Sequence, residues 1–318
     1  MKAVFGKNYR NILFKNPELQ TKNFYLGISM QKILHLIYAS FFYLTLSITA
    51  NQPFIIGTLE GQLGNQFFQI ANTVSIALDN NVRAIFPDLK NKFTFNIPLN
   101  YKYVFYRLDA CEPDSPVSTI YQEPYYHFTK VPYQEGMILK GWFQSEKYFK
   151  HHKNTIVKLF APSEEVKNYL KSKYNYIINH PKTVSIHIRM YKDTKPEFHP
   201  FVGWNYIHKA VNTFDQDSLF IVFSDQIDYC KKKLPKLLKN RNLVFIEGQH
   251  PFDFYDLYLM SMCNHHIISN SSFSWWGAYL NQNPKKIVIA PSPLRWFGPS
   301  LNHNNTTDLL PEEWNVLF

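Results

Sequence analysis

The strongest constraint on the fold is a regular alternation of apolar strands and helices in the second half of the chain. Strands are predicted at residues 184–188, 219–223, 243–246, 266–269 and 287–290. Helices are predicted between them, near residues 205–214, 227–238, 252–264 and 273–281. Alternation at this spacing is typical of a parallel, Rossmann-like sheet covered by helices.

The first half of the chain predicts a related but less regular arrangement. Strands are expected at residues 54–56, 82–86 and 136–143, with a helix after the first strand and a helical stretch over 145–173. Residues 87–134 show no clear period. The polar segment 175–182 separates the halves, so we predict an N-terminal domain at 53–178 and a C-terminal domain at 179–318. The length is sufficient for two such domains.

An apolar segment at residues 33–50 precedes these domains and contains no Asp, Glu, Lys or Arg. It just reaches the length needed to cross a bilayer. The leader at residues 1–32 carries six Lys or Arg against one Glu, and this bias predicts a membrane anchor with a cytoplasmic N-terminus. Two other interpretations stay open: a signal peptide starting at Met30, giving a secreted or periplasmic protein, or a buried helix of a cytoplasmic one.

The formal charge of +10 raises the question of nucleic-acid binding. The basic residues are scattered, however, and none of the usual nucleic-acid-binding motifs is present. A basic cleft for an anionic nucleotide, with a basic flank at a membrane, explains the charge more simply. The 3 cysteines are too few and too far apart for a disulfide framework or a zinc site.

The segment 184–189 alternates apolar and polar residues and ends in Arg189. In open α/β sheets, ligands bind outside the carboxyl ends of the strands. A guanidinium there suits a pyrophosphate, because its planar fork matches phosphate oxygens and keeps its charge. A strand that simply ends in a surface arginine is the ordinary alternative.

Further polar residues follow neighbouring strands of the same predicted sheet. Ser271 and Ser272 open a helix, so their hydroxyls and the backbone N–H groups form a candidate anion site. Asp256 lies in the first turns of the preceding helix, and we expect it near Ser272, where it can accept hydrogen bonds from a purine edge or a ribose. Each residue also has a structural explanation, as a helix-dipole acid or an N-cap. Together with Arg189 they predict a nucleotide-diphosphate pocket without a Walker loop.

Two other features bear on this pocket. Ser224 and Asp225 end the strand 219–223 at the same edge, where they either line the pocket or form a turn. No cluster of His, Cys and carboxylate residues has metal-ligand spacing, and a paired-Asp motif for a metal-bound nucleotide sugar is missing. We therefore predict a metal-independent donor site that neutralises the pyrophosphate with arginine and backbone dipoles.

The loop after the first strand has the wrong glycine spacing for a dinucleotide fingerprint. Gly61 and Gly64 would allow a ligand to approach the backbone closely, and Asn65 and Gln66 would offer it their amides. The alternative is an ordinary tight turn between a strand and a helix.

Four blocks of this sequence resemble blocks of the α-1,2-fucosyltransferases that use GDP-fucose. They are EGQLGNQFFQIA at 60–71, GWFQSEKYF at 141–149, VSIHIR at 184–189, and DLYLMS with NSSFSWWG at 256–277. The resemblance covers about residues 53–318. It implies an α/β fold of the glycosyltransferase B type, in which two Rossmann-like domains face a cleft. GDP-fucose would bind to the C-terminal domain and the acceptor on the N-terminal side.

The resemblance also implies roles for individual residues. Arg189 would neutralise the β-phosphate of the donor, and His187 and Asp256 would contact guanine or ribose. Phosphate would be held by the segment Ser271, Ser272 and Phe273. Asn65 and Gly64 would lie across the cleft near the fucose.

One motif departs from the family pattern. In the family motif, His-x-Arg is followed by a second Arg and then by Gly-Asp. Here the three corresponding residues are Met190, Tyr191 and Lys192. One cation is therefore missing from its usual place, which leaves either Lys192 or Lys195 to supply the charge, or a weaker activity.

The combined expectation is an inverting transfer of fucose from GDP-β-L-fucose to the 2-hydroxyl of a galactose-terminated glycan, with no cofactor. Such a displacement benefits from a general base on the acceptor hydroxyl. Glu197, His199 and Asp193 are the candidates, and the sequence does not choose among them. The alternatives are a transferase of fucose or another GDP-sugar to a different acceptor position, and a non-catalytic, membrane-tethered binder of nucleotides or glycans.

Overall fold

The computed structural model describes residues 52–191 and 195–318. The predicted leader, the apolar segment 33–50, Lys192 and Asp193 lie outside the described residues. Residues 51–318 group into one structural unit. Within the described ranges, no helix has both the length and the hydropathy that a membrane span requires.

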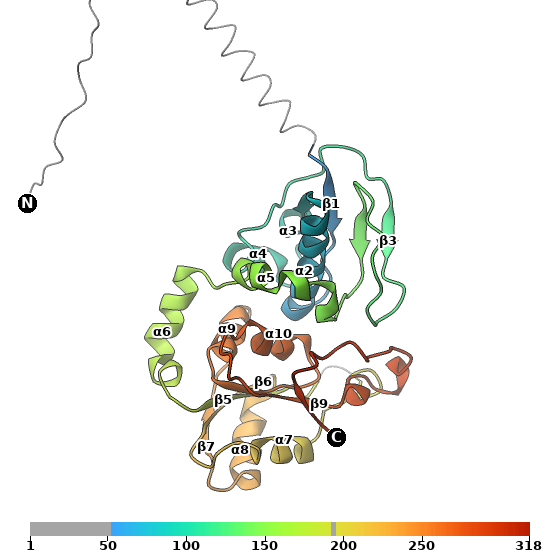
Figure 1. Ribbon diagram of the computed structural model, residues 1–318. Coiled ribbons are helices and arrows are strands. Elements are labelled where there is room, and N and C mark those ends of the chain that lie inside the picture. Colours follow the sequence, from blue (N-terminus) through green and yellow to red (C-terminus); the bar gives the residue numbers. More distant parts are fainter. Residues whose placement is uncertain (1–51, 192–194) are drawn as a thin grey trace, which may run out of the picture. The chain divides into compact units, whose positions relative to one another are not determined.

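The first half contains a four-stranded parallel sheet with the strand order β2-β1-β4-β3 (Figure 1). Its strands are β1 (Phe54–Gly57), β2 (Arg83–Ile85), β3 (Ile120–Gln122) and β4 (Ile138–Lys140). The three predicted strands are present, and β2 and β4 are shorter than the predicted ranges 82–86 and 136–143. Strand β3 was not predicted, because its three residues are mostly exposed and too few to show a period.

Helices and 3-10 turns join the strands of this sheet to one another and, after β4, lead to the second half. They are α2 (Leu63–Asn80), α3 (Asp88–Asn91), α4 (Ile97–Tyr103), η1 (Glu146–Tyr148), η2 (Lys150–His152), α5 (Lys153–Leu159) and α6 (Glu164–Ile178). The predicted helical stretch 145–173 is thus divided into several short pieces. Ser163 begins the last piece as an N-cap, since its side chain accepts a hydrogen bond from the amide of Val166.

The second half contains a six-stranded parallel sheet with the order β10-β9-β8-β5-β6-β7. Its strands are β5 (Thr183–Ile188), β6 (Leu219–Ser224), β7 (Asn242–Phe245), β8 (His265–Ile267), β9 (Val288–Pro291) and β10 (Asn315–Leu317). The five predicted strands are confirmed, and β10 is an addition. Every residue of β5 is buried, which agrees with its central place in the sheet.

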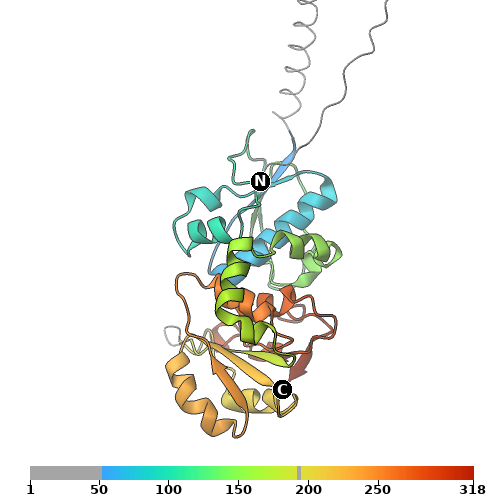
Figure 2. The ribbon, with the colours of Figure 1, turned by 90° about the vertical axis from the view of Figure 1, so that its left-hand side faces the viewer.

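Helices cover both faces of the second sheet. They are α7 (Trp204–Val211), α8 (Ile227–Leu237), α9 (Phe254–Ser261) and α10 (Ser272–Leu280), and the 3-10 turns η3 (Pro293–Arg295) and η4 (Pro299–Leu301) follow β9. Helices α7 and α8 lie on one face, while α9 and α10 lie on the face toward the first half (Figures 1 and 2). Because β5 pairs in parallel with both β6 and β8, the carboxyl ends of these three strands lie along one edge of the sheet.

A buried aromatic cluster joins α2 to α10. The ring of Phe68 lies 4.5 Å from that of Trp275, and the ring of Phe67 lies 5.2 Å from that of Trp276. All four side chains are fully buried. Since burial of a large apolar side chain contributes roughly 1.5–3 kcal/mol, this cluster fixes α2 firmly against α10.

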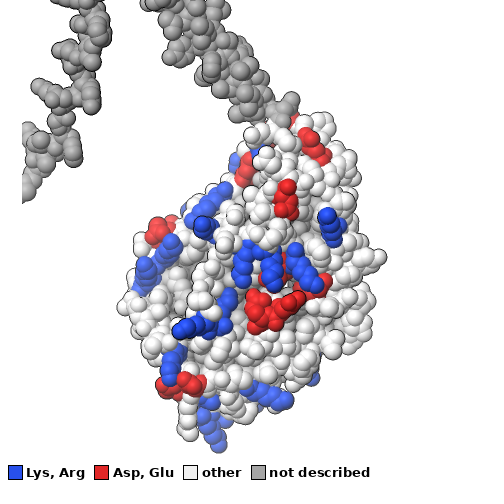
Figure 3. Space-filling model, in the orientation of Figure 1, with Lys and Arg blue, Asp and Glu red and all other residues white. Residues whose placement is uncertain are grey.

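On the face of the molecule shown in Figure 3, Lys and Arg side chains lie in several separate groups, and groups of Asp and Glu lie between them.

Candidate donor and acceptor site

Arg189 stands directly after β5, beside the carboxyl end of β6. One guanidinium nitrogen, Nη1, lies 3.5 Å from Oδ2 of Asp225. The carboxylate of Asp225 also accepts hydrogen bonds from the backbone amides of Met190 at 2.9 Å and Tyr191 at 3.1 Å. Asp225 therefore holds the turn that follows β5, and its ion pair with Arg189 is long enough to leave the guanidinium available to an anion.

The turn after β5 brings an aromatic ring against the guanidinium. Tyr191 has a φ of 52°, and its hydroxyl donates to the carbonyl of Asn270. The Arg189 guanidinium lies 5.2 Å from the centre of the Tyr191 ring, within range of a cation–π interaction. The side chain of Arg189 remains 41% exposed, so it is oriented without being enclosed.

His187 occupies the position before Ile188 in β5 and is buried. Its Nδ1 is hydrogen-bonded to the hydroxyl of Ser269 at 3.0 Å, and its ring lies 5.6 Å from that of Phe273. Burial and the nearby charge of Arg189 lower the pKa of His187 to about 3. The imidazole is therefore neutral under ordinary conditions and can only give or accept single hydrogen bonds.

Two helix N-termini meet close to these residues. Ser271 is the N-cap of α10, and its side chain accepts a hydrogen bond from the amide of Phe273. The hydroxyl of Ser272 donates to Oδ1 of Asn65 at 2.7 Å, near the start of α2. Neither helix carries an acidic residue in its first turn. Both N-termini thus present positive dipole ends that favour an anion.

Gly64 allows the N-termini of α2 and α10 to approach each other closely. A Cβ atom at this position would lie 2.5 Å from the backbone nitrogen of Phe273 and 2.7 Å from Oγ of Ser272. The space left by the missing side chain is filled by α10 itself. Gly61 has a φ of +72°, and the side-chain amide of Asn65 packs where its Cβ would be. Both glycines therefore serve close contacts within the protein.

A chain of hydrogen bonds continues from Ser272 into the first half. Asn65 Oδ1 also accepts from Nε2 of Gln144 at 2.9 Å, and the hydroxyl of Tyr126 donates to Oε1 of Gln144. The ring of Tyr126 lies 5.0 Å from that of Phe297, which belongs to the second half. Side chains from both halves are thus joined through one polar network.

Asp256 lies in the first turn of α9. Burial, with a contribution from Asp253, raises the pKa of Asp256 to about 7. Its Oδ1 is buried without a hydrogen-bond partner among the described residues, and Oδ2 faces Gly248, where an added Cβ would lie 3.8 Å away. No hydrogen bond within the described ranges joins Asp256 to Ser272, so their predicted proximity is not tested by a contact.

Comparison with known proteins agrees with this arrangement. The family model described as "Glycosyl transferase family 11" matches residues 25–314. The chain belongs to glycosyl transferase family 11.

Individual relatives are distant. The chain is similar to an alpha-1,2-colitosyltransferase of Escherichia coli, with 27% identity over 82% of this chain and 97% of the relative. It is also similar to galactoside 2-alpha-L-fucosyltransferase SEC1 of Bos taurus, with 25% identity over 70% of this chain and 62% of the relative. The crystal structure of the alpha-1,6-fucosyltransferase NodZ, co-crystallised with GDP, has a TM-score of 0.51 and 11% identity over 75% of this chain and 95% of that chain. This last likeness shows the fold: two parallel α/β sheets in a glycosyltransferase B-like arrangement.

The candidate bases of this glycosyltransferase differ in their surroundings. His199 stacks on Tyr191 with ring centres 5.1 Å apart, which brings it into the Arg189 cluster. Burial and the charge of Arg189 lower its pKa. Glu197 is exposed, and its backbone carbonyl accepts from the amide of Ser300 at 2.8 Å. Asp193 lies outside the described residues.

The remaining predicted residues have local structural contacts. The hydroxyl of Ser224 accepts from the amide of Gln226 at 3.0 Å and so forms a turn. Gln66 is fully buried, and its amide nitrogen donates to the carbonyls of Gly61 at 2.9 Å and Phe95 at 3.0 Å. The Gln66 side chain thus braces the first half of the family fold.

Three residues of the site and of its hydrogen-bond network were not among the predicted site residues. Tyr126 lies in the irregular region and Gln144 in the block 141–149, while Tyr191 was noticed only as a departure from the family motif. The Gln144 block was itself recognisable, and its resemblance to the family could have identified this side chain. Tyr126 has no comparable signal.

Proposed function

We propose that this chain transfers fucose from GDP-β-L-fucose to the 2-hydroxyl of a β-galactoside, with inversion at the anomeric carbon and without a metal ion. The observation that carries the proposal is the arrangement around Arg189. Its partly exposed guanidinium lies over the ring of Tyr191, whose hydroxyl bonds to Asn270 just before α10, and its charge acts on His187, whose ring lies beside Phe273 of α10. Membership of glycosyl transferase family 11 and the similarity to a galactoside 2-alpha-L-fucosyltransferase support the choice of sugar and linkage.

In this mechanism the protein stabilises the leaving diphosphate. As the bond between the anomeric carbon and the β-phosphate oxygen breaks, negative charge grows on the GDP. The guanidinium of Arg189 and the backbone N–H groups at the starts of α10 and α2 meet that charge without needing to reorganise. Asp225 contributes by fixing the turn from which Arg189 projects.

We propose His199 as the base that accepts the proton of the acceptor hydroxyl. Its lowered pKa means that the imidazole is already neutral at pH 7 and able to take up a proton. Replacing it by glutamine (His199→Gln) is expected to lower kcat about 100-fold or more, because general-base catalysis typically contributes 10²–10⁴. His303→Ala, at an exposed histidine, is the matched control. Unchanged kcat in His199→Gln would transfer the role to Glu197 or Asp193.

The direct test of the reaction uses radiolabelled GDP-fucose and lactose in the presence of EDTA. The expected result is a labelled trisaccharide whose fucose is linked to the 2-position of galactose. Labelled product with another linkage would change the acceptor assignment, and a strict requirement for Mn²⁺ would contradict the metal-free donor site. No transfer to any galactoside would favour a nucleotide or glycan binder.

A second donor is favoured by one specific observation, the similarity to the colitosyltransferase over nearly the whole relative. Colitose is the 3-deoxy counterpart of fucose. Competition between the two GDP-sugars in one assay separates the candidates: a fucosyltransferase has the higher kcat/KM with GDP-fucose, and the opposite ratio would assign the colitosyl donor.

We also propose that residues 33–50 anchor the enzyme to a membrane. The support is the charge-free apolar run and the basic leader before it. The full chain should stay with the membrane fraction after alkaline carbonate treatment, whereas a chain starting at Asn51 should not. Release of the full chain, or its recovery without the first 50 residues, would favour the buried helix or the signal peptide.

A further inference from the structure

A cluster of two histidines and a carboxylate lies at the end of α2 that is distant from the donor site. Nε2 of His152 lies 2.8 Å from Oδ1 of Asp79, and Nε2 of His151 lies 3.0 Å from Oδ2 of the same carboxylate. Asp79 follows Asn65 by fourteen residues along α2, which places it about 21 Å away along the helix axis at 1.5 Å per residue. The cluster is therefore separate from the proposed chemistry.

The cluster has the form of a built site. Although His151 and His152 are consecutive, the 3-10 turn η2 directs one ring nitrogen of each toward Asp79, and the three donor atoms all lie within 4.8 Å of one another. Oγ of Ser75, one turn before Asp79 on α2, lies 3.2 Å from Nε2 of His151. A continuous set of N and O donors thus bridges α2 and η2.

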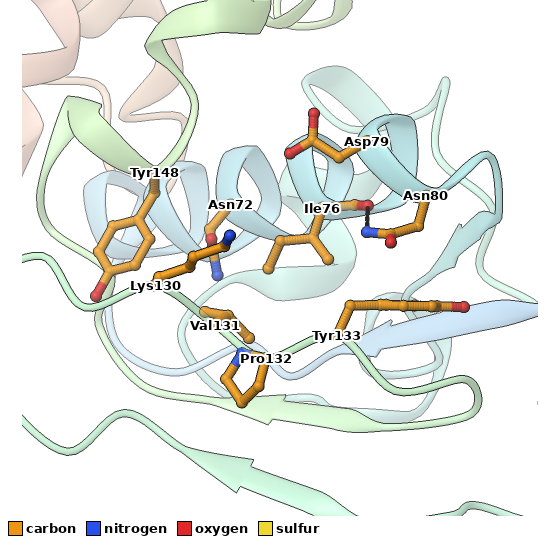
Figure 4. Close-up of a pocket in the computed structure, with 9 residues that line it drawn as sticks. All are labelled: Asn72, Ile76, Asp79, Asn80, Lys130, Val131, Pro132, Tyr133 and Tyr148. Carbon is orange, nitrogen blue, oxygen red and sulfur yellow. Dashed lines mark hydrogen bonds between the residues drawn. The ribbon is translucent and has the colours of Figure 1, made fainter.

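The neighbouring charges do not neutralise Asp79. Lys150 pairs with Glu146 at 3.0 Å, and Lys153 lies 3.9 Å from Glu313. Asp79 also borders a cavity of about 630 Å³, but its carboxylate points away from Val131 and Pro132, which line the same cavity (Figure 4). The carboxylate is therefore directed to the two histidines alone among the described ionisable groups.

We propose that Asp79, His151 and His152 bind a divalent transition ion of the Zn²⁺ class. Two imidazoles and one carboxylate favour zinc over Mg²⁺ or Ca²⁺, which prefer oxygen ligands. Tetrahedral zinc with bonds of about 2.0–2.1 Å separates its donors by roughly 3.3 Å. Oδ1 of Asp79 lies 2.8 Å from Nε2 of His152 and 3.1 Å from Nε2 of His151, so these two distances need to widen by a few tenths of an ångström. The three donor atoms lie within 4.8 Å of one another, so the two imidazoles close around the ion by rotating their side chains.

The three side chains have the freedom to make that adjustment. They are 45%, 50% and 27% exposed for Asp79, His151 and His152, so solvent can deliver the ion and a water can complete its coordination. Each imidazole would coordinate through the lone pair of Nε2, with its N–H proton on Nδ1. The ion would then link the last turn of α2 to η2 and stabilise only the folded state.

Zinc binding tests the proposal directly and independently of transfer activity. The full chain is prepared without a polyhistidine tag and with Cys111→Ser, since Cys111 is an exposed thiol that could bind zinc by itself. Titration against a chromogenic zinc chelator should show one tight equivalent, and zinc should raise the melting temperature by a few degrees.

Variants decide whether that equivalent belongs to this cluster. His151→Gln with His152→Gln should weaken zinc binding at least about 100-fold, since even outer-shell changes cost 10–100-fold, and should abolish the shift in melting temperature. Asp79→Asn keeps a hydrogen-bond acceptor but removes the charge, and should weaken binding less. His303→Ala should leave both readouts unchanged. Absence of a tight equivalent in the parent, or its retention in the double variant with native circular dichroism, would show that these residues form only His–Asp hydrogen bonds.

Discussion

The loop after β1 and the loop after β5 occupy equivalent places in their sheets but use their polar groups differently. In the first, the side-chain amide of Gln66 donates to two backbone carbonyls, and protein atoms occupy the space where a Cβ atom of Gly61 or Gly64 would lie. In the second, Arg189 makes one long ion pair among the residues that the structure describes, and it stays partly exposed. The comparison shows that glycine and amide residues beside a site can serve its internal structure. The groups that remain available to a ligand are those, such as the Arg189 guanidinium, whose hydrogen-bonding capacity is not fully used within the fold.

The largest effect should come from removing the group that the fold leaves available. Arg189→Ala is expected to lower kcat/KM for fucosyl transfer by about 100- to 1,000-fold, the range found when one preorganised donor to developing charge is lost. Arg189→Lys should recover part of this, because it restores the charge but not the bidentate fork. Lys232→Ala removes an exposed cation from α8 and is the control. Equal activity in Arg189→Ala and the control would exclude a catalytic role.

Substitution of Gly64, which serves a close contact within the protein, should lower the stability of the fold. Gly64→Ala would place a methyl group 2.5 Å from the backbone nitrogen of Phe273, so α2 and α10 must separate. We expect the free energy of unfolding to fall by about 2–3 kcal/mol, the usual effect of overpacking, together with a loss of activity. Gly248→Ala has room for its methyl group and is the control for stability. Chemical denaturation measures both, and a wild-type midpoint in Gly64→Ala would refute the tight contact.

The buried carboxyl of Asp256 should make the free energy of unfolding depend on pH. Its pKa is raised to about 7 in the folded state from 3.8, so the folded chain binds the proton more tightly than the unfolded chain. Stability from this group is present below the unfolded value and is lost as pH rises toward 7. Asp256→Asn should therefore increase the free energy of unfolding by about 4 kcal/mol at pH 8 and change it little near pH 4. A difference independent of pH would contradict the buried, unpaired carboxyl.

The same comparison explains what could be predicted from the sequence. The strands of the second half follow from apolar runs bounded by polar turns, and the position of Arg189 follows from the rule for carboxyl ends. Strand β3 and Tyr126 could not be predicted, since their places depend on pairing with distant segments. Asp79 and His151 are 72 positions apart, so their approach across α2 and η2 has no signature in local spacing.

The smallest effect should come from the network between the two halves. Tyr126→Phe removes the hydroxyl that donates to Oε1 of Gln144 and leaves this buried amide oxygen without its donor. We expect the free energy of unfolding to fall by about 1 kcal/mol. If the network also orients Asn65 against Ser272, KM for the acceptor should rise while kcat changes little. Tyr133→Phe, outside the network, is the control, and identical KM values in the two variants would show that the network supports stability alone.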